Sequence, residues 1–298
     1  MTKLKTPNYH RQRFLLALLE LTGGSLSKMD FQKLLFLSQQ DTECPHYDFV
    51  PYYYGCYSFQ AQSDIELLES KGWLLTVDSE IQLLEKSAAN MARDELARAS
   101  YFARKYKDHR GVELVRYVYE HYPYYAIHSK MAKDILSKSS YEAVIQVREK
   151  LKSNAKKLFT IGYEGLSFEK YINQLICHDV CLLCDIRNNP LSRKFGFSKG
   201  MLSHLLPKLG IEYIHIPELG IISESRNNLE TKSDYVQLFK VYREALPQKY
   251  GSLERLGGLL DQYKRIALTC FEKQHDSCHR HCVSEYLEDM RDIRAVHL

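Results

Sequence analysis

The second half of the chain repeats one unit, a short apolar strand followed by an amphipathic helix, and this repeat constrains the fold more than any other feature. The predicted strands are residues 157–165 (ending in a glycine turn), 180–186, 212–216 and 265–271, and the predicted helices are 168–177, 198–209, 235–245, 253–263 and 281–291. Strands that alternate with helices join through right-handed crossovers into a parallel sheet. We therefore predict, for residues 157–298, a Rossmann-like, mainly parallel α/β sheet with helices on both faces.

Residues 1–85 have a different pattern. Helical spacing of apolar residues predicts helices over 10–22, 28–40 and 60–70, and two short extended runs follow at 73–77 and 80–84. This order is that of a winged helix, a layout that serves DNA binding and protein docking alike. We therefore predict an α-rich, winged-helix-like N-terminal domain.

Three segments of this domain support a family resemblance. FQKLLFLSQ, PYYYGCYS and IELLESKGWL occur in that order between residues 31 and 74, and together they resemble the Panacea-type antitoxin domain. Cys56 stands where that family usually has a proline after Tyr-Gly. The resemblance implies a neutralising or substrate-recognising module, and we assign no catalytic residue to it.

The positive charge of the chain is concentrated between these two parts. Residues 86–156 hold 15 basic and 8 acidic side chains, a net charge of +7, whereas residues 1–85 carry −4 and the whole chain +4. The same block is rich in tyrosine and predicts helices over 91–106, 112–121 and 141–152. Lys and Arg neutralise phosphates and aromatic rings stack on bases. We predict a basic helical connector that contacts nucleic acid; the alternative is a solvated connector.

The sequence also indicates a cellular location. No apolar stretch approaches a membrane span, and the apolar run after the basic N-terminus offers no signal cleavage site. Eight cysteines in 298 residues are too dilute for a disulfide scaffold. We predict a cytoplasmic protein with reduced thiols and no membrane partner. No pattern predicts its oligomeric state.

Polar residues follow all four predicted strands of the C-terminal domain. In an open parallel sheet, ligands bind beyond the carboxyl ends of the strands, so we expect these residues to form one site. The candidates are Tyr163 after the first strand, Asp185, Arg187, Ser192, Arg193 and Lys194 after the second, Glu218 after the third, and Cys270, Glu272, His279 and Arg280 after the fourth.

The same segments carry a second resemblance. TIGYEG, CDIRNNPLSRKFGFSKGML, GIEYIHIPELG and ALTCFEKQHDSCHR occur in order and resemble the DUF488 family, a domain of unknown function, over about residues 158–290. That family has a TIG turn, D-x-R-x-x-P-x-S-R, H-x-P-x-L-G, and L-x-C-x-E followed by C-H-R. The resemblance implies the fold and the location of the site. It also implies action on nucleic acid, often near defence or modification genes.

These residue types favour base excision from DNA. The predicted phosphate- and substrate-binding residues are Tyr163, Arg187, Ser192, Arg193, Lys194, Cys270 and Arg280. Arginine suits phosphate because its planar fork donates two hydrogen bonds, and Tyr163 can stack on a flipped base. Paired carboxylates can stabilise an oxocarbenium-like transition state and orient water. Asp185 and Glu272 are the predicted pair, with Glu218 as a further carboxylate and His279 as a proton carrier. We predict no cofactor and no metal.

Three other functions remain open. Paired carboxylates with magnesium would make a metal-dependent nuclease. Cys270, at the end of a strand, would suit a rhodanese-like sulfurtransferase, although the following loop FEKQHDS lacks the glycines that a persulfide cradle favours. A non-enzymatic, antitoxin-like DNA-binding regulator would fit the N-terminal domain. The His and Cys residues between 275 and 282 could hold structural zinc, but this group contains no C-x-x-C pair to support such a site.

Overall fold

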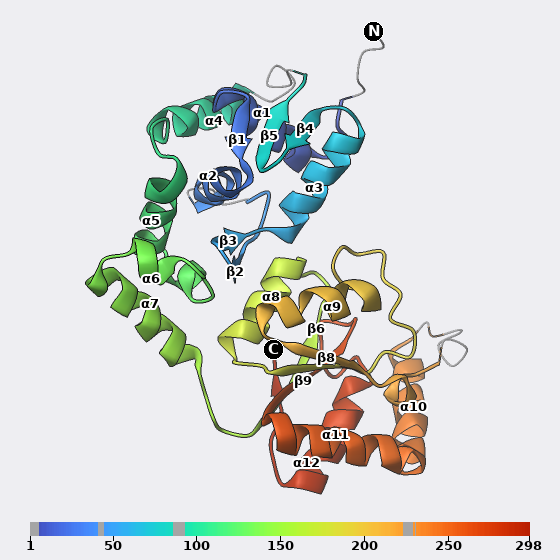
Figure 1. The fold of residues 1–298 in the computed structure, drawn as a ribbon. Helices are drawn as coiled ribbons and strands as arrows, with labels where there is room; N and C mark the ends of the chain where they lie inside the picture. The colour runs from blue at the N-terminus through green and yellow to red at the C-terminus, as the bar shows by residue number, and fades with distance from the viewer. Residues whose placement is uncertain (1–5, 41–44, 86–92, 223–228, 230) are drawn as a thin grey trace. The chain divides into compact units, whose positions relative to one another are not determined.

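The computed structural model describes residues 6–40, 45–85, 93–222, 229 and 231–298, which are drawn as ribbon in Figure 1. The chain divides into two compact units, residues 1–150 and 151–298. The three-part division at residues 85 and 156 stays a prediction. No helix among the described residues is long and apolar enough to cross a membrane.

The first unit confirms the predicted order of its helices and of its last two strands. Its elements are α1 (His10–Leu21), β1 (Ser25–Ser27), α2 (Lys28–Gln40), β2 (Val50–Tyr52), β3 (Gly55–Tyr57), α3 (Phe59–Ser70), β4 (Leu74–Val77), β5 (Glu80–Leu83), α4 (Arg93–Lys105), α5 (Gly111–His121), η2 (Pro123–Ala126), α6 (Ala132–Ile135) and α7 (Lys138–Leu151). The predicted start of the helix over 91–106 lies outside the described residues. The pattern did not predict β1, β2 and β3.

Two antiparallel sheets organise this unit. β1, β5 and β4 form one sheet in that order, and β2 pairs with β3. Ser27 caps α2 by accepting a hydrogen bond from the backbone N–H of Asp30, and the Asp30 carboxylate accepts one from the N–H of Gly111 at the start of α5. α5 is therefore tied to α2 across the unit. The identification of this unit as a winged helix stays a prediction.

The second unit has the predicted alternation of strands and helices. Its elements are β6 (Lys157–Gly162), α8 (Phe168–Cys177), β7 (Leu182–Asp185), α9 (Lys199–Leu205), η3 (Pro207–Leu209), β8 (Glu212–His215), η4 (Pro217–Leu219), α10 (Lys232–Ala245), η6 (Leu246–Lys249), α11 (Tyr250–Tyr263), β9 (Arg265–Cys270), α12 (Arg280–Arg291) and β10 (Val296–His297). The pattern missed β10, which covers only two residues.

The five strands of this unit form one parallel sheet in the order β10-β6-β9-β7-β8. β9 therefore lies between β6 and β7, although it comes last of the three along the chain. The connection after β9 leads to β10 at one edge, and the connection after β7 leads to β8 at the other. The connections that leave the adjacent strands β9 and β7 thus run in opposite directions. Such a pair of strands marks the topological switch point, where α/β sheets bind ligands.

Helices cover both faces of this sheet, with α8 and α9 on one side and α10, α11 and α12 on the other (Figure 1). Alternate residues of a strand point to one face, and Leu182, Cys184, Ile266 and Leu268 all join a buried core with α10, α11 and α12. On the opposite face, the Tyr171 hydroxyl of α8 donates to the Thr269 hydroxyl of β9. The C-terminal part thus has the predicted α/β class. Packing on both faces of the sheet holds the strands, and therefore the residues at their ends, in place.

Candidate active site

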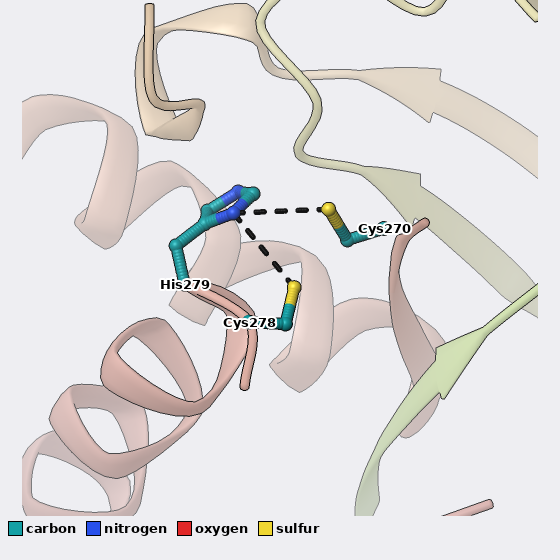
Figure 2. A group of neighbouring side chains, drawn as sticks. All are labelled: Cys270, Cys278 and His279. Atoms are coloured by element: carbon teal, nitrogen blue, oxygen red, sulfur yellow. Dashed lines mark hydrogen bonds between the residues drawn. The ribbon is translucent and has the colours of Figure 1, made fainter. Parts of the chain in front are cut away.

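A nine-residue loop follows β9 at the switch point and returns the chain to α12. It brings together three side chains, Cys270 at the end of β9 and Cys278 and His279 just before α12 (Figure 2). The Nδ1 atom of His279 lies 3.7 Å from the Cys270 sulfur and 3.8 Å from the Cys278 sulfur. These side chains, here called the Cys–Cys–His cluster, are 2%, 1% and 1% exposed, respectively.

A backbone carbonyl sets the protonation pattern of His279. Its Nε2 atom lies 3.1 Å from the carbonyl oxygen of Ile186, the residue after β7. A carbonyl oxygen can only accept, so Nε2 carries the hydrogen, and in neutral imidazole Nδ1 then has the lone pair. That lone pair faces both sulfurs. The cluster therefore places both sulfurs within 3.8 Å of one ring nitrogen.

Glu272 adds a carboxylate to the cluster. Its Oε2 atom accepts a hydrogen bond of 3.1 Å from the Cys270 thiol. Burial raises the pKa of Glu272, and the nearby Cys270 raises it further. The hydrogen bond from Cys278 lowers the pKa of Cys270, whereas burial raises the pKa of Cys278. Glu272 is the partly exposed member of the group.

Two residues hold this loop in place. The buried Arg280 guanidinium donates to the backbone carbonyls of Glu272 and Lys273. Gly162 ends β6 directly beneath the loop, where an added Cβ would lie 1.8 Å from the Glu272 carbonyl oxygen. Only glycine leaves room for this approach. Arg280 and Gly162 therefore fix the position of Glu272 from two sides.

Asp185 and Arg187, at the end of β7, form a buried ion pair. Asp185 is fully buried and its oxygens lie 2.8 Å from Arg187 Nε and 2.5 Å from Arg187 Nη2. Tyr213 also donates to Asp185, and Arg187 Nη1 donates to the Tyr163 hydroxyl and to the Phe197 carbonyl. Both charges are satisfied within the protein. This arrangement favours a positioning role for the pair over contact with substrate.

A cleft of about 450 Å³ opens beside the cluster. It is lined by Tyr163, Arg187, Asn188, Asn189, Leu191, Ser192, Arg193, Lys194, Ile221, Cys270 and Phe271. Arg193 is exposed, and Lys194 donates to the Tyr163 carbonyl. Leu191 and Phe271 are 81% and 44% exposed, respectively. The cleft thus combines cationic, carboxamide and exposed apolar side chains.

The structure brings most of the predicted site residues to this edge of the sheet. Tyr163, Arg187, Ser192, Arg193, Lys194 and Cys270 line the cleft, while Glu272 and His279 meet Cys270 next to it. The Tyr163 ring is buried and stacks on Phe197 at 4.3 Å. Arg280 is buried and engaged with the loop. Glu218 is exposed on η4 and is not among the residues that line the cleft.

Sequence reasoning placed Cys278 in a group of His and Cys residues but did not count it as a site residue. The structure divides that group: Cys278 and His279 face Cys270, His281 contacts Cys282, and His275 stacks on His297. One signal in the sequence could have identified Cys278: the pair Cys278-His279 follows a strand that itself ends in a cysteine, Cys270. Asn188 and Asn189, which also line the cleft, were visible only as polar residues after a strand.

Comparison with known proteins identifies part of this unit. Residues 167–287 match the family model of DUF488, described as a domain of unknown function. The match covers the Asp185–Arg187 pair and the whole Cys–Cys–His cluster. No curated protein and no solved structure matches the chain significantly.

Proposed function

We propose that the chain is an enzyme that hydrolyses a bond in DNA, and that the reaction takes place in the cleft beside the Cys–Cys–His cluster. The observation that carries this proposal is the make-up of the cleft. Exposed Phe271 and Leu191 lie there with the exposed cation Arg193. A nucleotide joins a flat base to an anionic phosphate, and these side chains offer a surface for each part.

Recognition of the phosphate falls to Arg193 in this proposal. Its guanidinium has the planar fork that binds phosphate oxygens. Lys194 adds a second positive charge to the same wall of the cleft, and Ser192 lies beside them with a hydroxyl group. Arg187 is excluded from this role because Asp185, Tyr163 and Phe197 already engage its guanidinium.

Recognition of the base falls to Phe271 and the two carboxamides. Base–aromatic stacking contributes about 1–3 kcal/mol, and Phe271 has a ring that is 44% exposed. Asn188 and Asn189 carry both donors and acceptors, which can pair with the edge of a base. A base flipped out of the duplex would meet these groups together.

The reaction that we favour is cleavage of the N-glycosidic bond. Water adds to C1′ of the sugar, the bond to the base breaks, and the base leaves with a proton. A carboxylate can orient that water and stabilise positive charge on the sugar. Glu272 is the partly exposed carboxylate next to the cleft-lining Cys270 and Phe271, and we assign it this role.

The first unit supplies an independent feature that fits nucleic acid. A second cleft of about 410 Å³, lined by Leu21, Thr22, Gly23, Ser100, Ala103, Arg104, Lys107 and Arg110, contains three cations. All three cations belong to the basic block of residues 86–156, whereas Leu21, Thr22 and Gly23 come from the end of α1 and the turn after it. Such a cleft can bind phosphate without regard to sequence. We propose that it contributes affinity for DNA, whereas the cleft of the second unit carries the reaction.

An end-labelled oligonucleotide assay tests this proposal. The full chain is incubated with DNA containing normal or modified bases, with and without a chelator, and half of each sample is heated in alkali. Breaks that need alkali report abasic sites and support base excision; direct breaks report phosphodiester cleavage. Glu272→Gln should abolish activity, whereas Glu212→Gln, at an exposed acid on β8, should not. No change in any DNA would refute the proposal.

One observation favours a second candidate, sulfur transfer at Cys270. The Cys270 thiol lines the cleft and contacts His279, as an activated nucleophile does. The thiolate would attack the outer sulfur of thiosulfate, sulfite would leave, and cyanide would take the sulfur as thiocyanate and regenerate the thiolate. Thiocyanate production that is lost in Cys270→Ser, in a chain inactive on DNA, would establish this function instead.

A further inference from the structure

We propose that Cys270, Cys278 and His279 bind one zinc ion. Among the residues that the structure describes, these form the only set of three His, Cys, Asp or Glu side chains whose ligand atoms all lie within 4.8 Å of one another. The site stands on geometry alone. Its role in hydrolysis rests on the function proposed above.

The distances within the cluster match those of a tetrahedral zinc site. Zn–S bonds of ~2.3 Å and Zn–N bonds of ~2.0–2.1 Å at tetrahedral angles place a sulfur and a nitrogen about 3.6 Å apart. The two distances from His279 Nδ1 to sulfur are 3.7 and 3.8 Å. Both sulfur–nitrogen distances agree with this spacing to within about 0.2 Å. Figure 2 shows the ring nitrogen directed at both sulfurs.

The surroundings of His279 match those of a metal ligand. A ligating histidine nearly always donates its other ring N–H to a carbonyl or carboxylate, which fixes the ring and raises its basicity. His279 Nε2 has such a partner in the Ile186 carbonyl, 3.1 Å away. Because Ile186 follows β7 and Cys270 ends β9, two strands of the sheet hold the ligands.

The donor set indicates which metal binds. Two thiols and an imidazole suit zinc, whereas magnesium and calcium require oxygen ligands. All three side chains are at least 98% buried, and thiolates at that depth need a compensating positive charge. Zinc would supply it. The cluster is therefore unsuited to the magnesium of a metal-dependent nuclease.

Three protein ligands leave the fourth zinc position free, as in catalytic sites. Glu272 lies beside that position, since its Oε2 atom is 3.1 Å from the Cys270 sulfur and its side chain is partly exposed. Zinc deaminases use the same combination, three Cys/His ligands and a Glu that handles protons without binding the metal. Zinc would supply Lewis-acid chemistry at that position, and Glu272 is the carboxylate that lies next to it. A zinc-bound Cys270 cannot also transfer sulfur.

The zinc content of the full chain tests this site directly. The protein is purified from medium with added zinc and without chelators, and metal is measured by mass spectrometry. About one zinc per chain is expected. After removal by a chelator, titration with cobalt should give the intense visible bands of a tetrahedral site and the near-ultraviolet band of cobalt–thiolate bonds. Wild-type protein that is folded, takes up no zinc and gives no cobalt–thiolate band would overturn the proposal.

Variants then identify the ligands. Cys278→Ser should lose the zinc and the cobalt–thiolate band, and His279→Gln should weaken zinc binding about 10–100-fold or more. Cys282→Ser is the matched control, because Cys282 is equally buried but contacts His281. Circular dichroism checks that each variant folds. Full zinc in Cys278→Ser would contradict the assignment, and so would loss of zinc in Cys282→Ser with Cys278→Ser unaffected.

The two proposals fail in different ways. A chain that binds zinc but leaves all DNA unchanged would retain the metal site and refute the function. A chain that releases bases yet binds no zinc would retain the function and refute the site. Glu272→Gln separates the roles further, because it should keep the zinc and lose activity. Loss of zinc from Glu272→Gln would show that the carboxylate is itself a ligand.

Discussion

Gly162→Ala should disrupt the site without disrupting the sheet. Gly162 ends β6, and the Glu272 carbonyl oxygen lies where an alanine side chain would stand, 1.8 Å from the added Cβ. Real Cβ atoms essentially never approach another atom within 3.0 Å. The loop after β9 must therefore move away by about 1.2 Å or more, the difference between these two distances. Backbone cannot rotate aside as the end of a flexible side chain can.

The size of the effect follows from what that movement breaks. Forcing a methyl group into a packed site costs about 1–3 kcal/mol. The Glu272 carbonyl also accepts a hydrogen bond from the buried Arg280 guanidinium, and a hydrogen bond to a charged group is worth about 1.5–3 kcal/mol. Because movement of the loop relieves part of the steric cost while it weakens the hydrogen bond, the two energies do not add in full. We therefore expect a loss of about 2–5 kcal/mol in the free energy of unfolding.

Urea unfolding of Gly162→Ala and Gly200→Ala provides the comparison. Gly200 lies in α9 with open space around an added Cβ, so alanine there should stabilise by about 0.5–1 kcal/mol. At temperatures where Gly162→Ala remains folded, it should also lose the cobalt–thiolate band and the activity on DNA. A Gly162→Ala protein with wild-type stability and an unchanged cobalt spectrum would refute the reasoning, because the loop could then not depend on this contact.

Three further predictions concern charged side chains. Asp185→Asn should destabilise the fold by about 3–5 kcal/mol, because it leaves the Arg187 charge buried without its partner, whereas Tyr213→Phe should cost only about 1 kcal/mol; equal effects in urea unfolding would contradict this. Arg193→Ala should weaken DNA binding and lower the slope of log K against log salt by about one, while Arg294→Ala, at an arginine 84% exposed outside the cleft, should leave the slope unchanged. Burial lowers the pKa of Lys33 below 10.5, so the unfolded chain binds more protons than the folded chain does. The free energy of unfolding of the wild type should therefore rise relative to that of Lys33→Met as the pH rises toward 10.5. Parallel curves of stability against pH for the two proteins would contradict this.

The α/β class was predictable because the relevant signals are local. Continuous apolar runs and the alternation of strand and helix are visible within short windows, and α8 covers Phe168–Cys177 as predicted. The order of the strands was not predictable from these windows. β9 inserts between β6 and β7, and the strand pairings that determine this choice join residues 84 and 108 positions apart. This insertion is what brings Cys270 next to Ile186 and the switch point.

The metal ligands were harder to identify for a related reason. Zinc motifs are recognised by closely spaced pairs, and here the two cysteines are separated by a loop of seven residues. A loop can fold in many ways, and this one is set by Gly162, far away in the sequence, and by Arg280. The His and Cys residues from 275 to 282 look alike in the sequence. The helix separates them, because Cys282 within α12 joins the buried core and contacts His281, whereas Cys278 and His279, just before α12, face Cys270.

The two predicted catalytic carboxylates show what could have been read from the sequence. Asp185 ends β7 and Glu272 lies two residues beyond the end of β9. The residue two positions from Asp185 is Arg187, whereas the residue two positions from Glu272 is Cys270. In extended chain, side chains two apart point to the same side. Asp-x-Arg therefore predicts an ion pair, and in the structure both charges are consumed by it. Cys-x-Glu offers no such cation, so the Glu272 carboxylate keeps its capacity to accept protons beside a thiol. This difference between the patterns Asp-x-Arg and Cys-x-Glu is the reason to look for the chemistry after β9 and for the residues that position it after β7.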